Sequence, residues 1–155
     1  MDTTSARSAA LLSYYAALNV LGATGLFSEV STSQHFEGQA TLTRRQLFPR
    51  TYLARHGHAS GATQIANSVL ASPQAVMFGS PGEYYPRLAK NLAPDRLAEM
   101  NHLHALPSRW HEMEYDAFLA ARRGAMSAVI REAFDRLPAV MPRKASRARA
   151  VPAKV

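Results

Sequence analysis

The clearest hydrophobic pattern in the chain runs from Tyr115 to Leu137, where apolar residues recur every three or four positions. This spacing puts them on one face of a helix, while charged residues such as Arg123 and Asp135 fall on the other faces. Pro138 follows and is expected to end the helix. We therefore predict a long C-terminal helix over 115–137, whose buried face is formed by Tyr115, Phe118, Leu119, Met126, Val129, Ile130, Ala133, Phe134 and Leu137.

Three weaker patterns predict shorter helices in the first half of the chain. From Ser8 to Leu21 apolar residues fall at helical spacing, and Gly22 follows as a stop signal. Thr51 to Arg55 fits a short helix that breaks at Gly57, and Ala62 to Leu70 returns to an apolar helical pattern. The first of these helices is expected to be buried through Leu11, Leu12, Tyr15, Ala16 and Leu18.

The best-defined helix start lies at Ser80-Pro81-Gly82-Glu83. Serine can accept a hydrogen bond as the N-cap, proline suits the first helical position, and a glutamate three residues after the cap can bond back to it. This helix is expected to run toward Asn91. Pro94-Asp95 marks another start, and predicts a helix that ends near Leu106.

Only one stretch favours strands. Residues from Phe36 to Phe48 include the apolar positions Ala40, Leu42 and Leu47, with Gly38 available for a turn, and this predicts a short hairpin. The preceding segment 26–35 is rich in Ser and Thr and is expected to be irregular. The sequence thus predicts an α+β, mainly α fold: one domain over residues 1–137, in which a small hairpin packs against short helices and the long C-terminal helix buttresses it.

Composition limits the class of protein. The 155 residues are 47% hydrophobic, enough for the core of one domain. The chain has no cysteine, which excludes disulfides, thiolate metal sites and cysteine nucleophiles and fits a cytoplasmic protein. Residues 8–28 carry no charge, but tyrosine, asparagine and glycine dilute their hydrophobicity. We therefore expect a buried helix there and no membrane association, with a membrane or exported segment as the alternative.

Positive charge is concentrated in two places. The net charge is +7, of which +5 comes from residues 138–155, which contain no acid and few large apolar side chains; we predict that this segment is a disordered basic tail. In the body no acidic residue lies between Glu37 and Glu83. A basic patch in that interval predicts contact with nucleic-acid phosphates, with a solvated surface as the alternative. The candidate nucleic-acid-binding residues are Arg44, Arg45, Arg50 and Arg55.

Two segments resemble a known nuclease core. Arg44 to Leu53 reads R-R-Q-L-F-P-R-T-Y-L and Ile65 to Ser68 reads I-A-N-S. Together they resemble the ββα-metal (HNH) core in the C-terminal region of GmrSD-type restriction endonucleases, which typically reads His-His-Ile-Phe-Pro-Arg, then Tyr-Leu, then Ile-Ala-Asn. Pro81 to Tyr85 and Tyr115 to Arg122 resemble later family helices, so that the likeness covers roughly residues 12–137.

The resemblance implies a site whose catalytic residues have been replaced. In the family, paired histidines supply a general base and a metal ligand, and an asparagine orients the base. The corresponding positions hold Gln46 for the base, Arg45 for the ligand and a retained Asn67, while Val76 stands where a further ligand is expected. Glutamine is not a base near neutral pH, and arginine is a permanent cation that repels a metal. We therefore expect no metal site, with Mg²⁺ or Mn²⁺ needed only if the protein is active.

These observations lead to one hypothesis and two alternatives. The hypothesis is a catalytically inactive HNH-like module of a restriction-modification or phage-defence system, which binds DNA or a separately encoded N-terminal restriction subunit without cleavage. The first alternative is an active metal-dependent endonuclease with relocated ligands, for which His35, His56 and His58 are candidates. The second is a structural remnant that only binds another protein.

Overall fold

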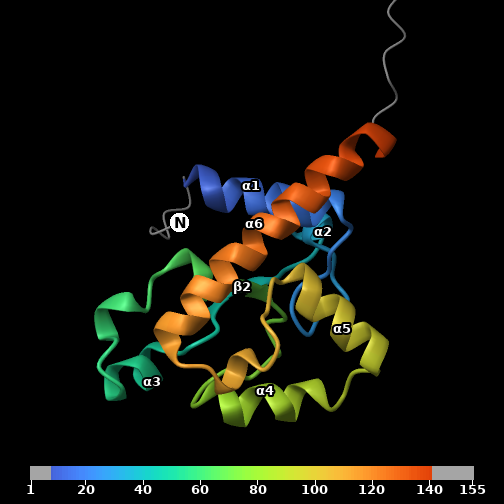
Figure 1. Ribbon diagram of the computed structural model, residues 1–155. Coiled ribbons are helices and arrows are strands. Elements are labelled where there is room, and N and C mark those ends of the chain that lie inside the picture. Colours follow the sequence, from blue (N-terminus) through green and yellow to red (C-terminus); the bar gives the residue numbers. More distant parts are fainter. Residues whose placement is uncertain (1–7, 141–155) are drawn as a thin grey trace, which may run out of the picture.

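The computed structural model describes residues 8–140, and helix accounts for 57% of it and strand for 8% (Figure 1). The predicted α+β, mainly α class is confirmed. In chain order the elements are α1 (Ala9–Val20), α2 (Thr32–Phe36), β1 (Thr43–Gln46), α3 (Arg50–Arg55), the 3-10 turns η1 (Ala59–Gly61) and η2 (Ile65–Asn67), β2 (Ser68–Ala71), α4 (Pro81–Ala89), α5 (Pro94–Leu103), the 3-10 turn η3 (Trp110–Glu112) and α6 (Tyr115–Val140).

The helices α1, α3, α4, α5 and α6 lie where the sequence predicts them. The start of α4 has the predicted capping box, in which Ser80 and Glu83 satisfy each other's backbone N–H groups. The predicted end of α6 at Leu137 is wrong by three residues, since the helix continues through Pro138 to Val140. Proline blocks one hydrogen bond but has a φ compatible with a helix, so the helix can run on beyond it.

The second strand lies outside the predicted hairpin. β1 pairs with β2 in antiparallel register, with Thr43 opposite Ala71 and Gln46 opposite Ser68. The prediction of a hairpin within residues 36–48 is therefore wrong, as is the prediction of a helix over 62–70. All four residues of β2 are buried. A short strand that is buried on both faces lacks the alternation of apolar and polar residues, so its sequence cannot be distinguished from that of a buried helix.

Other segments pair with both edges of β2. β1 covers one edge, and on the other the N–H of Leu26 donates to the carbonyl of Leu70 at 2.8 Å while the N–H of Ser72 donates to the carbonyl of Leu26 at 2.9 Å. The segment around Leu26 therefore acts as a third, minimal partner of the sheet.

The helix α2 corrects the prediction that residues 26–35 are irregular. The N–H of Gln34 donates to the hydroxyl of Ser31 at 3.1 Å, and the side-chain oxygen of Gln34 accepts from the N–H of Ser31 at 2.9 Å. This reciprocal capping box stabilises a one-turn helix that composition alone does not suggest.

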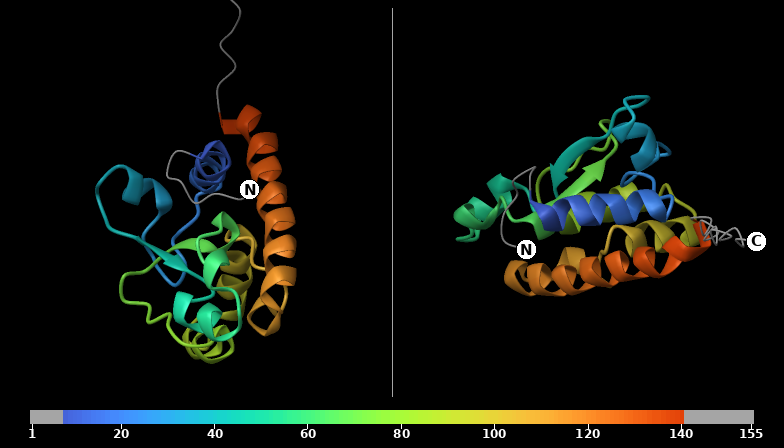
Figure 2. Two further views of the ribbon diagram at one scale, coloured as in Figure 1. Left: turned by 90° about the vertical axis from the view of Figure 1, so that its left-hand side faces the viewer. Right: turned by 90° about the horizontal axis from the view of Figure 1, so that it is seen from above.

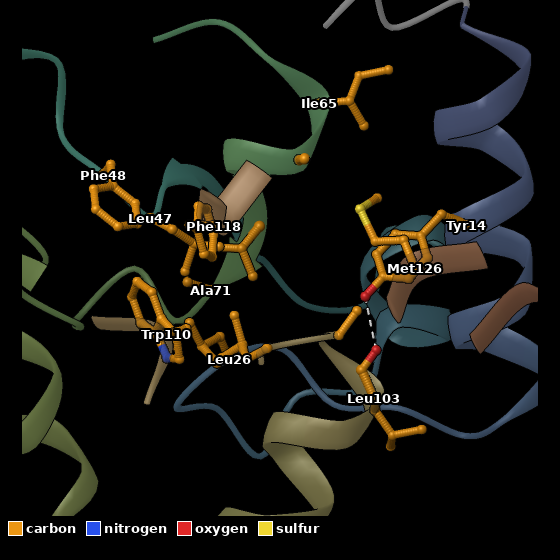
Figure 3. Packing of buried hydrophobic residues seen from close by; sticks show 14 of the residues in the cluster. Tyr14, Leu26, Leu47, Phe48, Ile65, Ala71, Leu103, Trp110, Phe118 and Met126 are labelled. Atoms are coloured by element: carbon orange, nitrogen blue, oxygen red, sulfur yellow. Dashed lines mark hydrogen bonds between the residues drawn. The ribbon is translucent and has the colours of Figure 1, made fainter. Parts of the chain in front are cut away.

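The core lies between α6 on one side and the strand pair on the other, with α1 packed beside α6 (Figure 2). Figure 3 shows Phe48, Phe118 and Trp110 together at one side of this core and Tyr14 and Met126 at the other. The ring of Phe48 lies 4.7 Å from Phe118 and 5.9 Å from Trp110, measured between centroids. Phe48, which follows closely after the end of β1, is thus the centre of an aromatic cluster that joins the strand to α6.

The exposed faces of α1 and α6 differ in part from the prediction. Leu12 is 54% exposed and Phe134 is 71% exposed, and Ala16 is also exposed, whereas Tyr14 and Ala17 are buried. Figure 1 shows the C-terminal turns of α6 projecting past the other elements.

Within residues 8–140, none of the helices combines the length and the apolar character that crossing a membrane requires. The predicted tail, residues 138–155, begins with three residues that belong to α6, and from residue 141 onward it lies outside the described residues.

Candidate phosphate-binding site

The two segments that carry the family resemblance lie side by side. Gln46 at the end of β1 pairs with Ser68 at the start of β2, and the N–H of Leu47 donates to the carbonyl of Asn67 at 2.8 Å. The antiparallel pairing therefore brings residues 44–50 and 65–68 together, although they are separate along the chain.

Asn67 is buried, and its side-chain hydrogen bonds within residues 8–140 are all made to main chain. Its Oδ1 accepts from the N–H of Phe48 at 2.7 Å, and its Nδ2 donates to the carbonyls of Phe48 and Ala62 at 3.0 Å each. A buried amide with its donors and acceptor paired in this way fixes the backbone that it touches. Asn67 is thus a positioning residue for the turn between β1 and α3, and none of its surface is open to solvent.

Buried side chains from α4 and α6 hold the same two segments. The hydroxyl of Tyr84 donates to the carbonyl of Leu47. From α6, Nη1 of Arg122 donates to the carbonyls of Ala66 and Ser68 at 2.7 Å each. Burial raises the pKa of Tyr84, so the phenol stays neutral and donates. Together with Asn67, these groups set the position of the surface formed by β1 and the loop after it.

That surface contains a hollow of about 500 Å³, which we call the arginine hollow. Three of the four predicted arginines line it, while Arg55 is not among its lining residues. No acidic residue is among those lining it in the described part of the chain. The lining residues are Arg44, Arg45, Gln46, Pro49, Arg50, Thr63, Ser68 and Met77.

Arg45, which lines this hollow, also makes a hydrogen bond outside it. Its Nη2 donates to the carbonyl of Pro73 at 3.1 Å, which ties β1 to the loop after β2. Its Nε is buried and has no hydrogen-bond partner among residues 8–140. A guanidinium has five N–H donors, so Arg45 keeps donors beyond the one that Pro73 uses.

The residue types in the arginine hollow determine which chemistry it can perform. Guanidinium groups bind phosphate oxygens with charge-assisted and often bidentate hydrogen bonds, and the amide of Gln46 can both donate and accept. The described lining residues include no histidine and no carboxylate, which are the usual general bases and hard-metal ligands. The hollow is therefore suited to holding an anion rather than to activating water.

The histidines considered as relocated ligands lie elsewhere. His35 accepts from the N–H of Leu42 through Nδ1 at 3.0 Å. His56 stacks on Tyr52 with a centroid separation of 4.1 Å. Neither residue lines the arginine hollow.

His58 belongs to a cluster that sequence reasoning did not identify. Its Nε2 lies 3.8 Å from Oε1 of Glu114, and its Nδ1 lies 3.9 Å from Oδ1 of Asp116. One ring nitrogen of His58, one carboxylate oxygen of Glu114 and one of Asp116 lie within 4.8 Å of one another, so the three residues form a candidate cation-binding group. The two carboxylates flank opposite nitrogens of the ring, so a metal bound to either nitrogen requires one carboxylate to move.

Sequence reasoning also missed the residues that support the hollow. Arg122 lies in a segment that resembles a family helix, but the resemblance assigns it no role. Its spacing from Tyr115 and Phe118 places it on the buried face, which is the signal that could have found it. Met77 and Phe78, beside the hollow, carry no signal in the sequence.

Comparisons of the chain with protein-family models, with curated proteins and with solved structures find no match.

Proposed function

We propose that this chain is a catalytically inactive HNH-like module that binds DNA through the arginine hollow. The observation that carries the proposal is the meeting of Arg44, Arg45 and Arg50 with Gln46 in one hollow, where no acidic residue of the described range 8–140 is among the lining residues. The hollow lies at the β1 positions where the resembled family has its catalytic histidines. Guanidinium groups in such a place attract and orient phosphates.

The absence of cleavage follows from the residue types. Hydrolysis of a phosphodiester needs a group that accepts a proton from water and, in this family, a metal held by neutral or anionic ligands. Gln46 and Arg45 supply neither. The proposed protein therefore has no requirement for Mg²⁺ or Mn²⁺ when it binds DNA.

The resemblance also suggests a setting. The proposed module works in the cytoplasm, as part of a restriction or phage-defence system, and a separately encoded N-terminal restriction subunit is a candidate partner. The family resemblance is the support for this setting, and the arginine hollow is the support for DNA contact.

A native gel with labelled duplex DNA tests the proposal, run once with Mg²⁺ or Mn²⁺ and once with a chelator. We expect a shift of equal size in both conditions and no cleavage. The double variant Arg45→Ala/Arg50→Ala should weaken the shift, while Arg131→Ala, an exposed arginine on α6, should leave it unchanged. The absence of any shift, both with the duplex and with its separated strands, would contradict DNA binding and would favour a module that only binds protein.

A second candidate function is an active metal-dependent nuclease that uses the cluster of His58, Glu114 and Asp116, and the proximity of these three side chains favours it. Cleavage in the metal lane that is abolished by His58→Ala and retained in His56→Ala would support this candidate. Cleavage of that kind would contradict the inactive module.

A further inference from the structure

The loop between β2 and α4 presents an exposed aromatic side chain next to the arginine hollow. Phe78 is 73% exposed and its neighbour Val76 is 46% exposed, whereas Met77 between them is 6% exposed and lines the hollow. Adjacent Cα atoms are about 3.8 Å apart, so the backbone of Phe78 adjoins the wall of the hollow. Among the large hydrophobic side chains that the structure describes, Phe78 is the most exposed.

This loop is anchored at two points. Nη2 of Arg45 donates to the carbonyl of Pro73 at 3.1 Å, and Nη2 of Arg87 donates to the carbonyl of Val76 at 2.9 Å. One anchor comes from β1 and the other from α4. Both bonds are made to the residues that precede Phe78, so the segment that leads to the exposed ring is tied to β1 and to α4.

The same loop also lines a second, smaller hollow. It measures about 290 Å³ and is lined by Val76, Phe78 and Arg87, together with Gly79, Glu83 and Tyr84. Glu83 is the acid there, and its carboxylate is used in the capping box of α4. The loop thus contributes Met77 to the arginine hollow, and it contributes Val76 and Phe78 to a hollow that contains a further arginine.

An arginine cluster beside an exposed aromatic ring matches the chemistry of unpaired nucleic acid. The phosphates of a strand need cations, and each base offers a flat face on which an aromatic ring can stack. In a duplex these faces are covered by the neighbouring base pairs, so an exposed phenylalanine finds no partner there without unstacking. An apolar ring that is mostly in water gains most from a ligand that covers it.

We infer that the site binds an unpaired DNA strand, with a phosphate in the arginine hollow and an adjacent base stacked on Phe78. This inference rests on the proposed function, because it assigns the preferred form of DNA to the same hollow. It adds an aromatic contact that the resemblance to the nuclease core does not supply.

Fluorescence anisotropy with the full chain tests the inference, using a labelled single strand and a labelled duplex of the same sequence. The variants are Phe78→Ala, the conservative Phe78→Tyr, and Phe134→Ala as a matched control, because Phe134 is 71% exposed but lies on α6. We expect Phe78→Ala to weaken binding of the single strand about 10-fold. Phe78→Tyr should retain the affinity, Phe134→Ala should bind like the wild type, and Phe78→Ala should leave binding of the duplex unchanged.

The possible failures are distinguishable. If Phe78→Ala binds the single strand like the wild type while Arg45→Ala/Arg50→Ala binds it less well, base stacking is refuted and the arginine hollow stands. If Phe78→Ala weakens duplex and single strand equally, the preference for an unpaired strand is refuted. If the wild type binds neither DNA, the proposed function fails and the inference fails with it.

Discussion

Arg122 of α6 donates a hydrogen bond of 2.7 Å from Nη1 to the carbonyl of Ser68, the first residue of β2. The same nitrogen donates to the carbonyl of Ala66, and Nε and Nη2 donate to the carbonyl of His104. A fully buried cation thus serves as the donor for three main-chain carbonyls. The long C-terminal helix positions the segment that pairs with the arginine-bearing strand.

Replacing this cation should destabilise the domain. Arg122→Met keeps much of the side-chain volume but leaves the three carbonyls buried without donors, and each unsatisfied group costs about 1–3 kcal/mol. We expect the free energy of unfolding to fall by about 3 kcal/mol or more. Urea denaturation measures the loss, and Arg131→Met, an exposed position on the same helix, should change stability by less than about 0.5 kcal/mol. An Arg122→Met protein as stable as the wild type would contradict this account of α6.

Asn67 allows a subtler test of the turn after β1. Asn67→Asp preserves the shape and the acceptor for the N–H of Phe48, but it puts an oxygen where Nδ2 donates to the carbonyls of Phe48 and Ala62. The loss of two donors and the burial of an acid should cost at least about 2 kcal/mol of stability. The exposed Asn91→Asp serves as the control in thermal unfolding. Equal melting temperatures for the two variants would rule out a positioning role.

His104 predicts how stability depends on pH. Burial lowers its pKa from 6.5 to about 4, although its Nε2 donates to the carbonyl of Thr24 at 2.7 Å. The unfolded chain takes up a proton near pH 6.5 and the folded chain does not, so the free energy of unfolding should fall as the pH drops from about 6.5 to 4. The loss attributable to this residue is about 3 kcal/mol.

Urea denaturation across that pH range checks the prediction. His104→Gln retains a donor toward Thr24 but cannot titrate, so its stability should fall less steeply than that of the wild type. The exposed His56→Gln should keep the wild-type slope. If the slope of His104→Gln matches that of the wild type, another group causes the acid sensitivity.

Local signals account for the elements that the sequence predicts correctly. The capping box at Ser80 and Glu83 and the apolar face of α6 depend on residues close in sequence, which is why the pattern of residues alone locates α4 and α6. The capping box of Ser31 and Gln34 is equally local, but it lies in a stretch whose composition favours an irregular segment, so α2 was not predicted.

Non-local relationships account for the elements that the sequence does not predict. β2 is a strand because it pairs with β1 and with the segment around Leu26. The pattern of apolar and polar residues over 62–71 indicates neither of these pairings. The basic interval is visible in the sequence, but the sequence does not show that Arg44, Arg45 and Arg50 share one hollow or that Arg55 does not line it. The loop before Phe78 is likewise held by non-local hydrogen bonds from Arg45 and Arg87, which the sequence does not reveal.

The salt dependence of DNA binding is the sharpest test of whether the arginine hollow binds phosphates. The measurement is the slope of log affinity against log salt concentration for the full chain, with residues 138–155 present in every variant so that their charge contributes equally. Arg45→Ala/Arg50→Ala should reduce the slope by about one for each phosphate that these two arginines neutralise, while Arg131→Ala should retain it. A double variant with the affinity and slope of the wild type would mean that the DNA contacts lie elsewhere, and the account would be wrong.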